Sequence, residues 1–190
     1  MSEHLPPQEA HWPEDAIFTL GHSTLPIEHF TAVVQIYAIE RLVDIRTIPR
    51  SRHNPQFNNT TLAKSLTAQH LEYMHIQALG GLRHARKDSP NTGWRNGSFR
   101  GYADYMQTEE FQDALEALIQ MSGQRRVAIM CAEAVPWRCH RSLVADALCV
   151  RDVPVVEILS DTSYRMHTLT PFAKVEGVRI TYPSDQARLL

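Results

Sequence analysis

The sequence predicts an α/β protein of three layers, built on a mainly parallel, doubly wound, Rossmann-like sheet of about five strands. Five short apolar runs alternate along the chain with amphipathic segments of helical period. Such alternation requires right-handed crossover connections, which place the strands parallel in one sheet and cover both of its faces with helices. Polar or glycine-containing stretches also follow the apolar runs, as in open α/β sheets that bind ligands at one edge.

The first half of the chain supplies three of the expected strands. These are the runs 16–20, 41–45 and 72–76. Apolar residues at helical spacing predict a helix over 27–37, between the first two strands. Leu62 and Leu66 lie four residues apart and predict a second helix over 60–70, which begins with threonine. The stretch 46–58 contains two prolines and is expected to form a loop.

The second half opens with a long irregular segment. Residues 80–101 are rich in glycine and basic residues, show no apolar period and are expected to form a functional loop. The elements expected next are a helix over 111–121, a strand over 125–130, a helix over 142–150 and a strand over 153–159. Beyond Ser160 the pattern is less regular, with one further candidate strand at 178–182.

Length and composition predict one soluble domain. The chain has 190 residues, 43% of them hydrophobic and 21% charged, which is ordinary for a globular protein. We expect a flexible segment over 1–15 and a single domain over 16–190. No apolar run approaches the roughly 20 residues that cross a bilayer, and the polar start does not resemble a signal peptide. Three cysteines do not form a disulfide framework, so we expect reduced thiols, a cytoplasmic location and no membrane partner.

The net charge of −2 conceals a basic segment. Residues 41–100 contain ten Lys or Arg against three Asp or Glu, a balance of +7, whereas the remainder has nine against eighteen, or −9. A basic segment in an otherwise acidic chain indicates an anionic ligand, with a nucleotide or nucleic acid as the obvious candidates. The alternative is that these cations are spread over unrelated faces of the fold.

The stretch CAEAVPWRCHRS, residues 131–142, holds two of the three cysteines and follows the fourth predicted strand. A zinc site commonly begins with a close cysteine pair, but Cys131 and Cys139 are separated by seven residues, so no metal ion is expected. A phosphatase loop would place five residues between its cysteine and arginine, whereas six lie between Cys131 and Arg138. The stretch also lacks the glycines that help backbone N–H groups to wrap a phosphate.

Three residues of this stretch are candidates for catalysis. Cys131 leaves the fourth strand at the expected ligand edge and is the candidate nucleophile. Glu133 lies two residues beyond a buried strand and is a candidate acid or base together with His140. Cys139 precedes a helix whose positive end favours a thiolate. The alternatives are packing for Cys131 and Cys139, and a salt bridge for Glu133; packing is expected for Cys149.

Other residues at the strand ends are candidates for substrate binding. His22 and Ser23 lie in a turn before a helix, where backbone N–H groups attract anions. Arginines form forked hydrogen bonds to phosphate, and aromatic rings beside arginines stack on bases, unless the rings serve to pin their loop to the core. The candidates are His22, Ser23, Asp44, Arg46, Arg52, Trp94, Tyr102, Cys139 and Arg141. No dinucleotide or P-loop motif is present, and no cofactor is expected.

In combination these motifs are similar to those of a known family. GHST, DIRTIPRSR, LGG, FRGYADYM and C-x-E-x5-CHR, in this order over Ile17–Leu159, resemble the family catalogued as domain of unknown function 488. The resemblance implies a compact α/β domain with its signature residues in one pocket, and it supplies no reaction. The implied signature positions are His22, Ser23, Asp44, Arg46, Pro49, Ser51, Arg52, Gly80, Gly81, Tyr102, Cys131, Glu133, Cys139, His140 and Arg141.

Three functions are open at this point. The leading hypothesis is a hydrolase or group transferase acting on a phosphate-bearing substrate, such as a nucleotide or a nucleic-acid base. Arg46, Arg52 and Arg141 would then hold the anion, and Trp94 or Tyr102 would stack on the base. The alternatives are a nucleic-acid-binding module without catalysis and a redox or sulfur-handling protein that uses its cysteines. The enzyme hypothesis requires the catalytic candidates to converge on one open pocket.

Overall fold

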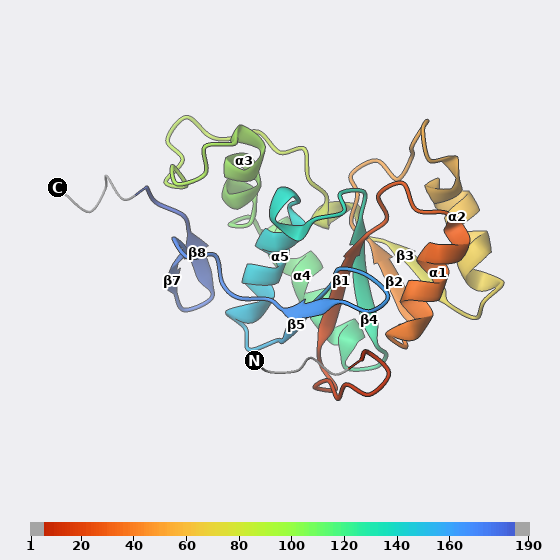
Figure 1. Cartoon of the computed structure of the whole chain (residues 1–190). Helices are drawn as coiled ribbons and strands as arrows, with labels where there is room; N and C mark the ends of the chain where they lie inside the picture. The colour runs from red at the N-terminus through yellow and green to blue at the C-terminus, as the bar shows by residue number, and fades with distance from the viewer. Residues whose placement is uncertain (1–5, 185–190) are drawn as a thin grey trace.

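A six-stranded sheet forms the centre of the computed structural model, which describes residues 6–184 (Figure 1). The strands are β1 (Ile17–Gly21), β2 (Arg41–Asp44), β3 (Glu72–His75), β4 (Val127–Cys131), β5 (Val155–Ile158) and β6 (Tyr164–Met166). Their order is β3-β2-β4-β1-β5-β6, and all neighbours pair in parallel except β5 and β6. The predicted fold class is confirmed, with β6 added as an antiparallel edge strand.

Helices cover both faces of the sheet (Figure 1). One face carries α1 (Ile27–Ile36) and α2 (Asn59–Thr67), and the other carries α3 (Gly97–Tyr105), α4 (Glu109–Ser122) and α5 (Arg141–Cys149). Because side chains alternate along a strand, Ile129 packs towards α4 and α5 whereas Ala128 and Met130 pack towards α1 and α2. The central strands are therefore buried on both faces, and polar side chains concentrate at their ends.

Helix α3 begins inside the segment that was expected to be a loop. The Asn96 side chain accepts a hydrogen bond of 2.8 Å from the backbone N–H of Ser98 and so caps the helix. Tyr102, Ala103 and Met106 then bury a short apolar stripe against the core. The loop that was expected over 80–101 therefore ends at Asn96. The helix was not predicted because a single turn of apolar contacts is too short to show a period in the sequence.

The chain after β6 is fastened to the sheet by buried charged groups. His167 bonds to Glu157 of β5 at 2.7 Å and to Asp146 of α5 at 2.8 Å, and Arg165 forms an ion pair with Glu157. The hydroxyl of Tyr182 donates to the other oxygen of Asp146 at 2.8 Å. The strand expected at 178–182 forms as β8 (Arg179–Thr181), which pairs with β7 (Lys174–Glu176) in a separate hairpin.

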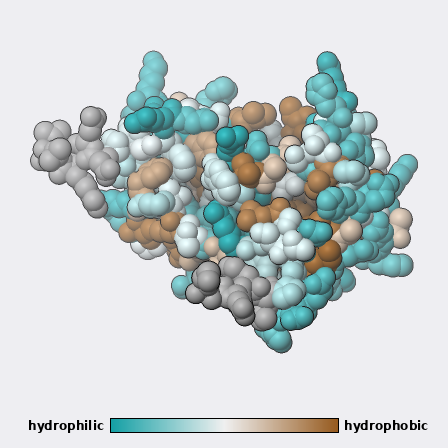
Figure 2. Space-filling model, in the orientation of Figure 1, coloured by the Kyte–Doolittle hydropathy of each residue, from teal (hydrophilic) through white to brown (hydrophobic). Residues whose placement is uncertain are grey.

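A flexible N-terminal segment was expected over 1–15, followed by a single domain that continues to residue 190. Residues 1–5 and 185–190 lie outside the described part of the structure. Within the predicted leader, the ring of Trp12 packs edge-on against Phe18 and Tyr164, with centroids 5.5 Å and 4.5 Å away. The face shown in Figure 2 is largely hydrophilic with separate apolar patches. Over the described residues, no helix is long and apolar enough to span a bilayer.

Candidate functional site

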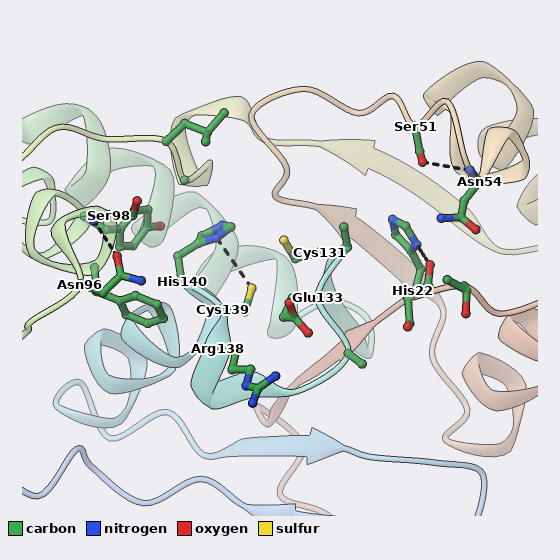
Figure 3. Close-up of a pocket in the computed structure, with 18 residues that line it drawn as sticks. His22, Ser51, Asn54, Asn96, Ser98, Cys131, Glu133, Arg138, Cys139 and His140 are labelled. Atoms are coloured by element: carbon green, nitrogen blue, oxygen red, sulfur yellow. Dashed lines mark hydrogen bonds between the residues drawn. The ribbon is translucent and has the colours of Figure 1, made fainter.

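A polar cleft of about 610 Å³ lies at the carboxyl ends of the parallel strands (Figure 3). Its walls come from the turn after β1, the loops after β2 and β3, the start of α3 and the segment 131–140 after β4. In the close-up, the sulfur atoms of Cys131 and Cys139 lie between Ser51 and Asn54 on one side and Asn96 on the other. The exits of β1 to β4 meet at this edge as expected, whereas the exit of β5, which was also expected here, does not line the cleft.

The segment after β4 is held in place by main-chain bonds and by one glycine. The backbone N–H groups of His22 and Ser23 donate to the carbonyls of Cys131 and Ala132 at 3.0 Å and 2.9 Å. A Cβ atom on Gly21 would lie 1.8 Å from the carbonyl oxygen of Glu133, so only glycine allows the two segments to approach this closely. The first and fourth strands therefore shape this wall of the cleft together.

Arg141 supports the same wall from behind. Its side chain is fully buried; Nη1 donates to Oγ1 of Thr19 at 2.8 Å, and Nη2 donates to the carbonyl of Glu133 at 2.5 Å. A second bond from Nη2 reaches the carbonyl of Ala134 at 3.3 Å. These contacts use the guanidinium to fold the segment after β4 onto β1, and Arg141 does not line the cleft.

Cys131, Cys139 and His140 form a compact cluster on the floor of the cleft. One ligand-type atom from each residue lies within 4.8 Å of the others, and the Sγ of Cys139 is 3.7 Å from Nδ1 of His140. The Nε2–H group of His140 donates to the carbonyl of Ile45 at 3.2 Å. In neutral imidazole this leaves the lone pair on Nδ1, directed at the sulfur atoms.

The two thiols of the cluster differ in their acidity. A hydrogen bond from the Cys131 thiol, together with the nearby His140 and Arg141, holds the pKa of Cys139 below its ordinary value although burial opposes this. Donating that bond, together with burial, raises the pKa of Cys131. Cys139 is therefore the more acidic thiol of the pair, and it lies just before the N-terminus of α5.

A second buried cluster links β2 to the turn after β1. Asp44 is fully buried and accepts bonds from the hydroxyl of Tyr73 at 2.8 Å and from Arg46, whose Nη2 lies 2.5 Å away. Arg46 also donates to the carbonyl of Phe57 at 2.8 Å and to Nε2 of His22 at 3.2 Å. Burial lowers the pKa of His22 to about 4, with the Arg46 charge acting in the same direction.

The candidates from the sequence fall into four groups in the structure. Those that line the cleft are His22, Ser23, Tyr102, Cys131, Glu133, Cys139 and His140. Arg46 lines an adjoining cavity of about 310 Å³, which shares Cys131 and His140 with the main cleft. Asp44 and Arg141 are buried behind these walls, and Arg52 and Trp94 are absent from the lining of both cavities.

Trp94 occupies an aromatic cluster beside the cleft. Its ring centroid lies 4.9 Å from those of Phe99 and Phe172 and 5.5 Å from that of Tyr182. Tyr102 lines the cleft but is only 1% exposed, and its hydroxyl donates to the carbonyl of Leu79 at 2.7 Å. The two aromatics selected from the sequence thus anchor the 80–96 loop, and Phe99 is the aromatic neighbour that lines the cleft with Tyr102.

Several cleft residues were not candidates for binding in the sequence analysis. Examples are Thr24, Asn54, Leu82, Asn96, Ser98 and Phe99, whereas Ser51 and Gly81 were implied by the family resemblance. Most of them are small polar residues in loops, and their residue types alone do not separate a binding role from a turn or a cap. Asn96 shows the difficulty, because the same side chain caps α3 and lines the cleft.

The charge of the basic segment 41–100 is partly neutralised. Its three acids each form an ion pair with one of its arginines: Asp44 with Arg46, Glu72 with Arg41 and Asp88 with Arg86. Besides Arg46, the arginines that line the two cavities are Arg50 of this segment, in the adjoining cavity, and Arg138, which lies outside the segment, in the main cleft. Anion recognition at this edge would therefore draw on these two side chains.

The comparisons with known proteins give one match. A family model described as Domain of unknown function DUF488 matches residues 26–148, which is more than half of the chain. The matched residues include β2 to α5 and the whole Cys131–Cys139–His140 cluster, whereas His22 lies just before them. No curated protein and no solved structure shows significant similarity to the chain.

Proposed function

The chain belongs to the DUF488 family, and we propose that it is a hydrolase or group transferase that acts on a polar, phosphate-bearing substrate in the cleft. One observation carries this proposal. Cys131, Glu133, Cys139 and His140 converge on one open, polar cavity at the ligand-binding edge of the sheet. A set of residues with a purely structural role has no reason to gather nucleophilic, acidic and basic groups at a solvent-accessible cleft.

The lining of the cleft indicates the kind of substrate. Hydroxyl and amide side chains of Ser51, Asn54, Asn96 and Ser98 offer neutral hydrogen bonds on two opposite sides of the cluster (Figure 3). Arg138 adds one positive charge to the same lining. A volume of about 610 Å³ is in the range of small-molecule sites, and a nucleotide combines one anionic group with many neutral hydrogen-bonding groups.

Glu133 is the proposed acid or base. Its contact with Arg141 uses the backbone carbonyl and not the carboxylate, and the side chain is exposed in the lining of the cleft. A carboxylate in this position is able to exchange protons with a bound substrate or water. The bond from Nε2–H of His140 to the carbonyl of Ile45 holds the ring in one orientation, with Nδ1 next to the Sγ of Cys139. We therefore assign His140 to the cysteine cluster and not to proton transfer with Glu133.

The test is a substrate screen with matched variants. The full chain is incubated with nucleoside mono-, di- and triphosphates and with short single-stranded oligonucleotides, and products are identified by mass spectrometry. We expect turnover of at least one of these, and Glu133→Gln should lower kcat by about 10²- to 10⁴-fold. Glu116→Gln, at an exposed position of α4, is the control and should leave kcat unchanged. No turnover in the panel, or full activity of Glu133→Gln, contradicts the proposal.

A thiol redox function is the second candidate, and it is favoured by the two sulfur atoms of Cys131 and Cys139, which lie within 4.8 Å of each other. Two neighbouring thiols can form a disulfide when an oxidant such as hydrogen peroxide accepts their electrons and both protons are lost. Loss of two hydrogens from the intact mass after mild peroxide treatment would support this function. It should be reversed by a dithiol reductant and absent in Cys131→Ser.

A further inference from the structure

We propose that Cys131, Cys139 and His140 bind a zinc ion whose fourth coordination position opens into the cleft. The inference deepens the proposed function, on which it rests, by supplying a Lewis-acidic centre to the same site. It is carried by three observations: the spacing of the three ligand atoms, the partner that orients His140, and the position of all three residues in the cleft lining.

The distances suit a tetrahedral ion after small adjustments. With Zn–S bonds of about 2.3 Å and Zn–N bonds of about 2.0 Å, neighbouring ligand atoms of a tetrahedral site lie roughly 3.5–3.8 Å apart. The Sγ of Cys139 lies 3.7 Å from Nδ1 of His140, and all three ligand atoms lie within 4.8 Å of one another. The sulfur and nitrogen atoms would therefore need to move by about 1 Å at most to surround one ion, which small side-chain rotations achieve.

His140 is already oriented as a ligand. Metal-binding histidines commonly donate their second ring N–H to a carbonyl, which fixes the tautomer and the direction of the ligating nitrogen. Here Nε2–H donates to the carbonyl of Ile45 at 3.2 Å, and Nδ1 is left to face the sulfur atoms. Gly81 leaves room on this side of the ring, since a Cβ atom there would lie 3.1 Å from Nδ1.

The two cysteines are held on rigid elements. Cys131 is the last residue of β4, and its carbonyl accepts a bond from the N–H of His22 at 3.0 Å. Cys139 follows the short helix η3 (Pro136–Arg138), and its N–H donates to the carbonyl of Pro136 at 2.9 Å. Its own carbonyl accepts from the backbone N–H of Ser142 at 3.1 Å and from the Ser142 hydroxyl at 3.0 Å, at the start of α5. A site built on fixed backbone loses little order on binding an ion.

The chemistry of the donors selects zinc among the common divalent ions. Two thiolates and one imidazole are soft to borderline ligands, which bind zinc well and calcium or magnesium poorly. Three protein ligands leave one position for water or substrate, which is the arrangement of catalytic rather than structural zinc sites. The three residues line the cleft, so that position is accessible from it.

Glu133 shares the cleft with the three proposed ligands. It lies two residues after the ligand Cys131 and lines the same cleft. In zinc deaminases a glutamate two residues after a ligand is not itself a ligand and moves protons for the zinc-bound water. With zinc held by Cys131, Cys139 and His140, the ion would lower the pKa of a bound water, and Glu133 would be the group placed to accept its proton.

The experiment measures metal binding alone and requires no substrate. The full chain is purified under reducing conditions, loaded with Zn²⁺, freed of excess metal and analysed for zinc by mass spectrometry. Affinity is measured by competition with a chromophoric chelator, and Co²⁺ replaces Zn²⁺ to record the visible spectrum. We expect one zinc per chain and the intense spectrum of tetrahedral cobalt with thiolate charge-transfer bands.

The variants separate this cluster from other cysteine chemistry. Cys131→Ser and Cys139→Ser should each weaken zinc binding by more than the about 10- to 100-fold that loss of an outer-shell partner causes. Cys149→Ser is the matched control, because Cys149 lies at the end of α5 outside the cluster, and it should bind as the parent does. Thermal unfolding of each variant without metal shows whether the fold is retained.

Three results would overturn the inference. They are a chain that takes up no zinc, zinc binding that survives Cys131→Ser and Cys139→Ser, and a Cys131–Cys139 disulfide that persists in the reduced preparation. Failure here is distinct from failure of the proposed function. Turnover by a chain that takes up no zinc would refute the zinc site alone, and a zinc-loaded chain that consumes no substrate would refute the enzyme proposal alone.

Discussion

Nδ1 of His140 lies 3.7 Å from the Sγ of Cys139, although the two residues are neighbours in the chain. The contact forms because Nε2–H of His140 is bound by the carbonyl of Ile45, at the end of β2, which turns the ring back over the preceding residue. Adjacent residues are commonly directed away from each other. The carbonyl of Ile45, which follows β2, is the contact that keeps the two side chains together.

Gly21 is predicted to be irreplaceable for stability. In Gly21→Ala the new methyl group would lie 1.8 Å from the carbonyl oxygen of Glu133, so the segment after β4 must shift. We expect the free energy of unfolding in urea to fall by roughly 1–3 kcal/mol, as in other overpacked sites. Gly97→Ala is the control, since nothing lies within 4 Å of its Cβ position at the start of α3, and it should be neutral or slightly stabilising. Equal stabilities of the two variants would contradict this account.

Arg141 is predicted to act on stability through the main chain of the cleft wall. Arg141→Lys retains the charge but cannot reproduce the bonds to Thr19 and to the carbonyl of Glu133. We expect a loss of about 2–4 kcal/mol in the free energy of unfolding, because buried polar groups are left without partners. Arg138→Lys makes the same substitution at an exposed arginine, and its free energy of unfolding should lie within about 0.5 kcal/mol of that of the parent. If Arg141→Lys lowers the free energy of unfolding no more than Arg138→Lys does, Arg141 does not support the cleft wall in the way described.

The network around His167 predicts that stability depends on pH in the alkaline range. Bonds to Asp146 and Glu157 raise the pKa of His167 to about 9, against an ordinary value of 6.5, although burial opposes this. The protonated form is thus favoured by folding. Its contribution is fully present below about pH 6.5 and is lost as the pH rises through 9, with a total on the order of 3 kcal/mol.

Urea unfolding between pH 6 and pH 10 checks this prediction. The charged and polar groups that face His167 are Asp146 of α5 and Glu157 of β5, with Arg165 on Glu157 and Tyr182 on Asp146. Burial and the Asp146 charge raise the pKa of Tyr182, so its phenol does not titrate in this range. His167→Gln should flatten the alkaline decline, whereas His84→Gln, at an exposed position, should retain it. If the free energy of unfolding of His167→Gln still falls at alkaline pH as in the parent, a group other than His167 causes the pH dependence.

Gly81 is predicted to control the ligating face of His140. In Gly81→Ala the added Cβ would lie 3.1 Å from Nδ1, close enough to displace the ring by a few tenths of an ångström. We expect zinc affinity, measured by chelator competition, to fall by roughly 10- to 100-fold, as when an outer-shell partner is lost. Gly123→Ala, whose nearest contact is 3.7 Å, should bind zinc as the parent does. Unchanged affinity in Gly81→Ala would show that the ring adapts without loss.

The fold was largely predictable because it rests on local patterns. Apolar runs and helical periods located the five main strands, and the rule for parallel sheets placed their carboxyl ends at one edge. Helix α3 was missed because its buried stripe is one turn long. The antiparallel strand β6 was also missed, since a three-residue edge strand with exposed positions leaves no periodic signal.

The candidate site was predictable as a place but only partly as a set of roles. The strand-end motifs singled out Cys131, Glu133 and His140, and the structure places all three in one lining. The expectation that no metal ion would bind rested on seven residues between the cysteines, and η3 folds that interval back on itself. The sequence also does not distinguish an arginine that binds a ligand from one that donates hydrogen bonds to carbonyls of its own chain, as Arg141 does.

The sequence by itself determined the α/β architecture, the family and the edge at which chemistry would gather, because each of these follows from local periodicity and the order of motifs. Only the tertiary structure decided which side chains face the cleft and which support it. That division depends on contacts between strands far apart in the chain, such as Ile45 with His140 and Thr19 with Arg141. Linear spacing carries no information about such contacts, since the distance between two atoms is set by how the strands pair and not by how many residues separate them.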